Sequence, residues 1–142
     1  MATYTAPLRD MQFVMRDLLN IEKHYQSLPD CDEVNQELID AILGEASKFS
    51  EEVVAPLNAV GDEVGCQLVE DGEVRTPPGF REAYQQYVEG GWPSLEQPAQ
   101  YGGQGLPMSL GTTIREMNGT ANWSWAMYPG LSHGAVDTIE AH

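Results

Sequence analysis

The chain has 142 residues, a formal net charge of −15, a sequence pI near 4.2 and 42% apolar residues. This length suits one folded domain with a core of its own. The acidic balance repels phosphate and argues against nucleic acid as a partner. No apolar run approaches the ~20 residues that span a bilayer, and the N-terminus lacks a secretory signal. We therefore expect a cytoplasmic protein without a membrane span.

The spacing of apolar residues predicts two helices in the first half of the chain. The first runs from near Asp10, which can act as its N-cap, to Pro29. Its apolar face consists of Met11, Val14, Leu18, Ile21 and Tyr25. The second opens with a capping-box variant at residues 30–33, is kinked at Pro56 and ends at Gly61. Its apolar face consists of Leu38, Ile42, Ala46, Phe49, Val53 and Leu57.

Residues 67–75 are predicted to form a small β-hairpin, because two short extended segments flank Asp71-Gly72, a pair that favours a type I′ turn. The Thr-Pro-Pro-Gly segment at 76–79 then ends the extended structure and opens a third helix, which ends at Gly90-Gly91. Its apolar face consists of Phe80, Ala83, Tyr84, Tyr87 and Val88.

A long ordered loop is expected over residues 92–108. Its apolar anchors are Trp92, Leu95, Tyr101, Leu106 and Met108. Ser109 can cap a fourth helix, in which Gly111 and Gly119 suggest close approach by another backbone. The apolar face of this helix consists of Leu110, Ile114, Met117 and Ala121. With a fifth helix from about Leu131 to the end, the predicted fold class is mostly α, a helical bundle with one small hairpin.

The glycines of the loop do not match a phosphate-binding motif. The segment Gly102-Gly103-Gln104-Gly105 lacks the Lys and Ser/Thr of a P-loop and follows no predicted strand, which excludes both nucleotide-binding interpretations. We interpret these glycines as positions of positive φ in a rigid loop that Trp92 and Tyr101 pin to the core. No His or Cys spacing matches a metal site, and Ser132-His133 has no acid partner for a hydrolase triad.

A set of short motifs follows in order along the chain: Gly91-Trp92, Pro98, Tyr101-Gly102-Gly103, Gly105-Leu106-Pro107, Glu116 and the segment 121–135. Together they resemble the N-terminal helical domain of the acyl-CoA dehydrogenases. Further segments are similar to the branch of that family that contains 3-methylmercaptopropionyl-CoA dehydrogenase. These segments are 4–11, Ala55-Pro56-Leu57-Asn58, Gly61-Asp62, Gly65-Cys66 and 76–80.

The resemblance implies part of an FAD-dependent flavoprotein oxidoreductase of fatty acid metabolism, which introduces an α,β double bond into an acyl-CoA. In the family, a middle β-domain and a C-terminal helical domain hold the flavin between them and supply the catalytic base. We expect residues 1–142 to be the N-terminal domain alone, with the other domains absent, no tightly bound FAD and no activity of its own. The implied partners are the acyl-CoA, the remaining domains of the enzyme, an electron-transfer flavoprotein and further copies in a homo-oligomer.

Five residues near the C-terminus fall, by this resemblance, where relatives line the distal end of the acyl cavity: Trp125, Ala126, Pro129, Gly130 and His133. An acyl chain needs an apolar wall, and Gly130 would leave it room. Ordinary core packing stays open as the alternative for each of them.

The loop residues Trp92, Tyr101, Gly102, Gly103 and Gly105 are expected to be structural. Glu116 is expected to be structural too, anchoring residues 101–103 through their backbone N–H groups, since the family's base lies elsewhere and no metal or catalytic residue is expected in this chain. The alternative function is a stand-alone helical interaction module derived from this fold, which binds a partner through an exposed apolar face.

Overall fold

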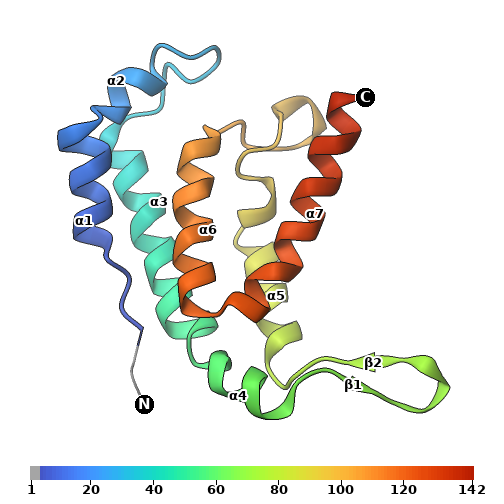
Figure 1. Ribbon diagram of the computed structural model, residues 1–142. Coiled ribbons are helices and arrows are strands. Elements are labelled where there is room, and N and C mark those ends of the chain that lie inside the picture. The colour runs from blue at the N-terminus through green and yellow to red at the C-terminus, as the bar shows by residue number, and fades with distance from the viewer. Residues whose placement is uncertain (1–3) are drawn as a thin grey trace.

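A computed structural model describes residues 4–142, whose helices pack side by side while a small hairpin projects from one end (Figure 1). The α-helices are α1 (Leu8–Gln12), α2 (Ile21–Tyr25), α3 (Gln36–Phe49), α4 (Leu57–Val64), α5 (Phe80–Glu89), α6 (Met108–Ala121) and α7 (Trp123–Ala141). The strands β1 (Gln67–Leu68) and β2 (Val74–Arg75) pair antiparallel. This confirms the predicted fold class, and within the described residues no helix is both long and apolar enough to cross a membrane.

Helix α6 lies in the middle of the bundle, between α3 and α7 in Figure 1. Its residues Leu110 and Met117 join a first core cluster with Ile39 of α3 and Tyr25 of α2. A second cluster surrounds Trp125 of α7, and its buried members are Val54, Phe80, Ala83, Tyr87 and Ala121. The whole predicted apolar face of α6 is buried. Because α6 is a regular α-helix, its 3.6-residue period keeps these apolar side chains in one stripe that faces the core.

The first predicted helix is interrupted in the structure. It begins at Leu8 rather than at Asp10, and Asn20 breaks it in the left-handed conformation with φ 48°. Ile21 and Tyr25 of α2 are nevertheless buried as expected.

Between α1 and α2 the chain forms a π-helix, Phe13–Leu18, which changes the buried face. Its wider turn is closed by the Leu19 N–H, which donates to the Val14 carbonyl at 2.9 Å. A π-turn rotates the side chains relative to a regular α-helix. Met15 is therefore buried, whereas Val14 and Leu18, both predicted core positions, are exposed.

Helix α3 starts later than predicted, and its buried face is shifted. Its N-cap is Asn35, whose side chain accepts a hydrogen bond from the Leu38 N–H at 2.9 Å, so the expected start at residues 30–33 is wrong. Leu38 is exposed, whereas Ala46 is buried as predicted. The other buried positions lie one residue after the predicted ones: Ile39, Leu43, Ser47, Ser50 and Val54, the last two in a π-helix Ser50–Val54 that continues α3.

Pro56 separates this stretch from α4, as expected for a kink, but the helix passes Gly61 and ends at Gly65 (φ 62°). Gly61 lies within α4 instead and lets Phe80 pack closely, since a Cβ at Gly61 would approach the Phe80 ring to 2.8 Å.

The hairpin is confirmed, but its turn is longer than a type I′ turn. Gln67 pairs with Arg75 and Leu68 with Val74. Residues 69–73 connect the strands through a 3₁₀ turn, Glu70–Gly72. Helix α5 then begins after Gly79 (φ 84°) and ends at Gly90, as predicted.

The segment between α5 and α6 is folded onto the bundle by fewer apolar anchors than expected. Leu95 is buried, and Trp92 and Leu106 pack against the first core cluster. Tyr101 and Met108 are 73% and 65% exposed, so their predicted anchoring role is wrong. Ser109 does not cap α6, which starts one residue earlier; its hydroxyl instead shares a 2.8 Å hydrogen bond with Tyr25 of α2.

Helix α7 begins at Trp123, well before the predicted start at about Leu131, and contains Pro129 in its interior. Asn122 caps it, because its side-chain oxygen accepts a hydrogen bond from the Trp125 N–H at 3.1 Å. A proline inside a helix costs about 3 kcal/mol, and burial of Trp125 one turn earlier offsets part of this cost.

Candidate functional site

A cavity of about 350 Å³ opens between α7, α6 and the segment that follows α5. Its apolar wall includes Trp92, Pro93, Trp123, Ala126, Met127, Pro129, Gly130 and Val136. Its polar wall includes Glu96, Gln97, Arg115, Asn118 and His133. The cavity therefore has an apolar side and one end formed by charged and hydrogen-bonding groups.

The structure brings most of the predicted acyl-site residues together here. Ala126, Pro129, Gly130 and His133 all line the cavity. Trp125 does not, because its side chain is fully buried in the second core cluster and its indole N–H donates to the Phe80 carbonyl at 3.3 Å. Trp125 is thus a core residue in this chain, and a role in binding stays a prediction for the other residues.

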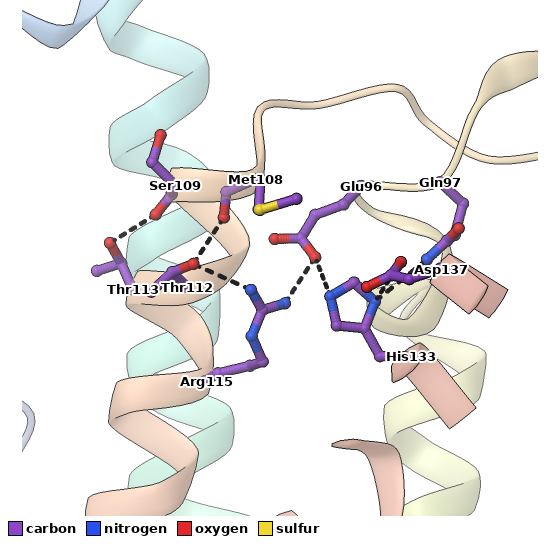
Figure 2. Close-up of polar contacts among 9 residues, drawn as sticks. All are labelled: Glu96, Gln97, Met108, Ser109, Thr112, Thr113, Arg115, His133 and Asp137. Carbon is purple, nitrogen blue, oxygen red and sulfur yellow. Dashed lines mark hydrogen bonds and ion pairs between the residues drawn. The ribbon is translucent and has the colours of Figure 1, made fainter. Parts of the chain in front are cut away.

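Glu96 organises the polar end of the cavity, as Figure 2 shows. Its side chain is 9% exposed, and one oxygen, Oε2, lies 2.6 Å from Arg115 Nη1 and 3.0 Å from His133 Nε2. Arg115 comes from α6, His133 from α7 and Glu96 from the connecting segment. Since charged groups attract strongly when shielded from water, this carboxylate ties three parts of the chain together.

Each ring nitrogen of His133 faces a polar partner. Nε2 lies 3.0 Å from Oε2 of Glu96, and Nδ1 lies 3.3 Å from the Gln97 amide nitrogen. Asp137, one turn later on α7, lies further away, with its carboxylate 3.6 Å from Nδ1. Both ring nitrogens thus have a partner on the segment that precedes α6.

Gly111 provides the space that Glu96 occupies. A Cβ at Gly111 would overlap the carboxylate of Glu96. The second oxygen of that carboxylate, Oε1, is buried and has no hydrogen-bond partner among the residues that the structure describes. The predicted close approach at Gly111 is therefore real, but a side chain makes it rather than a backbone; at Gly119 the neighbour is likewise a side chain, Trp123.

Tyr87 contributes an aromatic wall beside this polar end. Its ring packs edge-on against Trp125, with centroids 5.6 Å apart, and is tilted against Phe49. Burial raises the pKa of Tyr87 to about 12, with a smaller opposing effect of Arg115 and a further rise from Glu96. The hydroxyl therefore stays neutral through the physiological range.

The expected role of Glu116 as the anchor of the loop is wrong. Glu116 is exposed and, within residues 4–142, forms no hydrogen bond with residues 101–103. Backbone bonds hold these residues instead: the N–H groups of Tyr101 and Gly103 donate to the Pro98 carbonyl at 3.0 and 3.1 Å, and Gly102 donates to Ala99 at 3.0 Å. Arg115, the neighbour of Glu116, makes the side-chain contact to the preceding segment.

The glycines of this loop do not fit a flavin phosphate site. Gly102 and Gly105 have positive φ values of 85° and 65°, as predicted for a rigid turn. A Cβ at Gly103 would overlap the Gln97 carbonyl, so the protein's own backbone fills the space beside this glycine. Residues 90–107 also contain no Lys or Arg that could face a phosphate. The loop therefore packs against Gln97, which belongs to a polar cluster with Glu96, Arg115, His133 and Asp137.

Glu96, Gln97, Arg115 and Asp137 are the residues of this cluster that the sequence did not reveal. Glu96 stands in a loop without periodicity, and only the fold sets it against α6 and α7. One signal was present: Gly111 precedes Arg115 by one helical turn, so a close neighbour at Gly111 has to lie beside Arg115.

A second cavity, of about 620 Å³, lies at the base of the hairpin and contains none of the predicted site residues. Val74, Pro77, Phe80 and Tyr128 belong to its lining. Although it is larger, it has no buried charged group comparable to Glu96. The smaller cavity is therefore the better candidate for a specific ligand site.

No family model matches the chain, but two curated proteins are similar to it. It is 37% identical over 137 residues to the 3-methylmercaptopropionyl-CoA dehydrogenase of Ruegeria pomeroyi, which covers 96% of this chain and 23% of that protein. It is 29% identical over 144 residues to the butyryl-CoA dehydrogenase of Syntrophomonas wolfei, with the same two coverages. The chain thus spans about a quarter of the length of these relatives, and over nearly all of its own length it is homologous to acyl-CoA dehydrogenases.

Proposed function

We propose that this chain is the N-terminal helical domain of an FAD-dependent acyl-CoA dehydrogenase and that its cavity receives the acyl tail of the substrate. The observation that carries the proposal is the position of Ala126, Pro129, Gly130 and His133 around one cavity, in a chain homologous to such enzymes. The volume of about 350 Å³ lies at the lower end of the ~300–1,000 Å³ range of small-molecule sites. Together with the short acyl groups in the names of both relatives, this favours a short acyl chain.

In the proposed reaction, Cα of the thioester loses a proton and Cβ loses a hydride, and residues of this chain take part in neither transfer. Their contribution is positional: an apolar wall excludes water and holds the tail in one orientation. FAD, the catalytic base and the contact with an electron-transfer flavoprotein then belong to the rest of the enzyme, which we expect to be a homo-oligomer. Residues 1–142 alone are expected to be inactive.

Two glycines of α7 provide a matched test of the cavity. A Cβ at Gly130 or Gly134 would meet no atom within 4 Å, but only Gly130 lines the cavity. In the full-length gene product, we expect Gly130→Trp to lower kcat/KM for acyl-CoA at least tenfold. Gly134→Trp, one turn away, should change it less than twofold.

The measurement is reduction of bound flavin by acyl-CoA without oxygen, followed by steady-state rates. Equal flavin content in both variants shows that the fold is intact. If the protein contained no bound flavin, or if no acyl-CoA bleached that flavin, the proposed function would be wrong. Equal kcat/KM values in the two variants would contradict the proposal that the cavity receives the acyl tail.

Exposed apolar side chains on α7 support a second candidate, the stand-alone interaction module. Trp123, Leu131 and Ile139 are 70%, 73% and 78% exposed, and large exposed apolar side chains favour a protein partner. In the enzyme, neighbouring domains would cover these side chains; in the module, a separate protein would cover them. The flavin measurement separates the two, because a module has no reason to bind flavin.

A further inference from the structure

The polar end of the cavity is unusual for a site that receives only a hydrocarbon. His133 contacts Glu96 with one ring nitrogen and Gln97 with the other, and Arg115 retains donors that no described residue accepts. Its guanidinium has five N–H groups, and among residues 4–142 its hydrogen-bond partners are Glu96 and, at 3.0 Å, the Thr112 hydroxyl. The side chain is 39% exposed and lines the cavity. It can therefore donate to an acceptor in a ligand.

The charges at this end decide which acceptor fits. Arg115 is neutralised by Glu96 at 2.6 Å, and Asp137 adds a further negative charge near His133. The single positive charge of Arg115 stands beside the two carboxylates of Glu96 and Asp137, so this group has no surplus positive charge. A carboxylate in the ligand would thus meet repulsion as well as attraction, whereas a neutral oxygen would only gain a hydrogen bond.

We propose that Arg115 is a specificity-determining residue that selects acyl groups carrying a neutral hydrogen-bond acceptor, such as an ether or hydroxyl oxygen, near the distal end of a short chain. This inference rests on the proposed function and specifies its substrate class. The apolar wall formed by Ala126, Met127 and Pro129 binds the methylene groups of the chain. Arg115 then binds the acceptor at the polar end.

The test compares kcat/KM for three acyl-CoA substrates of the full-length gene product. Hexanoyl-CoA and 4-methoxybutanoyl-CoA have chains of equal length, and glutaryl-CoA ends in a carboxylate. A hydrogen bond donated by a charged group such as a guanidinium contributes about 1.5–3 kcal/mol, or roughly tenfold to a hundredfold in rate. We expect kcat/KM to favour the ether over the alkyl chain by about that factor and glutaryl-CoA to be the poorest of the three. In Arg115→Met the ratio of ether to alkyl should fall to about one.

Two controls separate recognition from folding. Thr112→Val removes the other partner of Arg115 but lies outside the cavity lining, so the ether preference should remain. Glu96→Gln combined with Arg115→Met removes both members of the ion pair, leaves no unpaired buried charge, and should also abolish the preference.

An equal ether-to-alkyl ratio in the wild type and Arg115→Met would overturn the inference while leaving the proposed function intact. Failure of all three acyl-CoA thioesters to bleach the flavin would instead overturn the proposed function. A wild-type preference for glutaryl-CoA would contradict the charge argument and therefore the inference.

Discussion

Glu96 is the residue on which the candidate site depends, because its carboxylate contacts two helices at once. A carboxylate that is 9% exposed is expensive to hold in a protein unless charged or hydrogen-bonding groups surround it. Here Arg115 and His133 share one oxygen, while Gly111 leaves room for the other. Removing any one of these partners should therefore affect the others, and their mutational effects should not be additive.

Gly111→Ala should reveal this coupling, because its effect on the free energy of unfolding should have opposite signs in the wild type and in a Glu96→Ala background. In the wild type a Cβ at Gly111 overlaps the Glu96 carboxylate, so we expect a loss of about 1–3 kcal/mol of stability from overpacking and displacement of the ion pair. In a Glu96→Ala background the same change should stabilise the protein by up to about 1 kcal/mol, since Ala is the better helix former.

Urea unfolding followed by tryptophan fluorescence measures both values. Gly44→Ala in α3 is the control, because a Cβ there would meet no atom within 4 Å; it should be stabilising in both backgrounds. A neutral Gly111→Ala in the wild type would contradict the coupling.

At the scale of elements, the regular helix was predictable and the irregular ones were not. The apolar period of α6 matches its buried face, since α6 is a regular α-helix that packs against both α3 and α7. The π-helices Phe13–Leu18 and Ser50–Val54 shift the register by local hydrogen bonding that leaves no mark in an apolar pattern. The same holds for α7, which was predicted from about Leu131 but starts at Trp123, where the side chain of Asn122 caps it.

Asn122→Ala should be more damaging than loss of an ordinary helix cap. Asn122 is 1% exposed, accepts from Trp125 N–H and the Ser124 hydroxyl, and donates to the Val54 carbonyl at 3.4 Å. A lost N-cap alone costs about 1 kcal/mol, and buried groups left without partners add about 1–3 kcal/mol.

The matched control is Asn35→Ala at the exposed N-cap of α3, which should cost only the capping contribution of about 1 kcal/mol. Chemical denaturation of both variants gives the comparison. If the two variants lost the same free energy of unfolding, Asn122 would contribute only as an N-cap, and its buried hydrogen bonds would add no further stability.

For the molecule as a whole, the buried and partly buried tyrosines make stability sensitive to alkali. Burial is the main cause that raises the pKa of Tyr4, Tyr25 and Tyr87, the last to about 12. A group whose pKa is higher in the folded than in the unfolded state stabilises fully below its unfolded value and loses this contribution as the pH rises through the folded value. Stability should therefore fall between about pH 10 and 12.

Tyr87 should account for about 2–3 kcal/mol of that loss, because burial raises its pKa to about 12. Tyr87→Phe removes the titration but keeps the ring, so its free energy of unfolding should decline less steeply over this range. Urea unfolding at a series of pH values in both proteins provides the measurement. Parallel pH profiles would show that Tyr87 does not titrate on unfolding as proposed.

The candidate site was predictable in part. Ala126, Pro129, Gly130 and His133 were indicated by resemblance to a family, and they do meet at one cavity. Trp125, next to Ala126 in sequence, points into the core instead, because neighbouring helical positions face directions about 100° apart. Resemblance in sequence identifies a segment, and helix geometry then decides which of its side chains reach a ligand.

The sequence by itself determined that this is an acidic, mostly helical chain with one hairpin, homologous to acyl-CoA dehydrogenases. Composition, apolar spacing and ordered motifs are properties of the chain read along its length. Only the tertiary structure decided that Glu96 meets Arg115 and His133 and that a cavity with one polar end lies beside them. Such contacts join residues from three separate segments, and an ion pair shielded from water forms only where the packed fold brings its charges together.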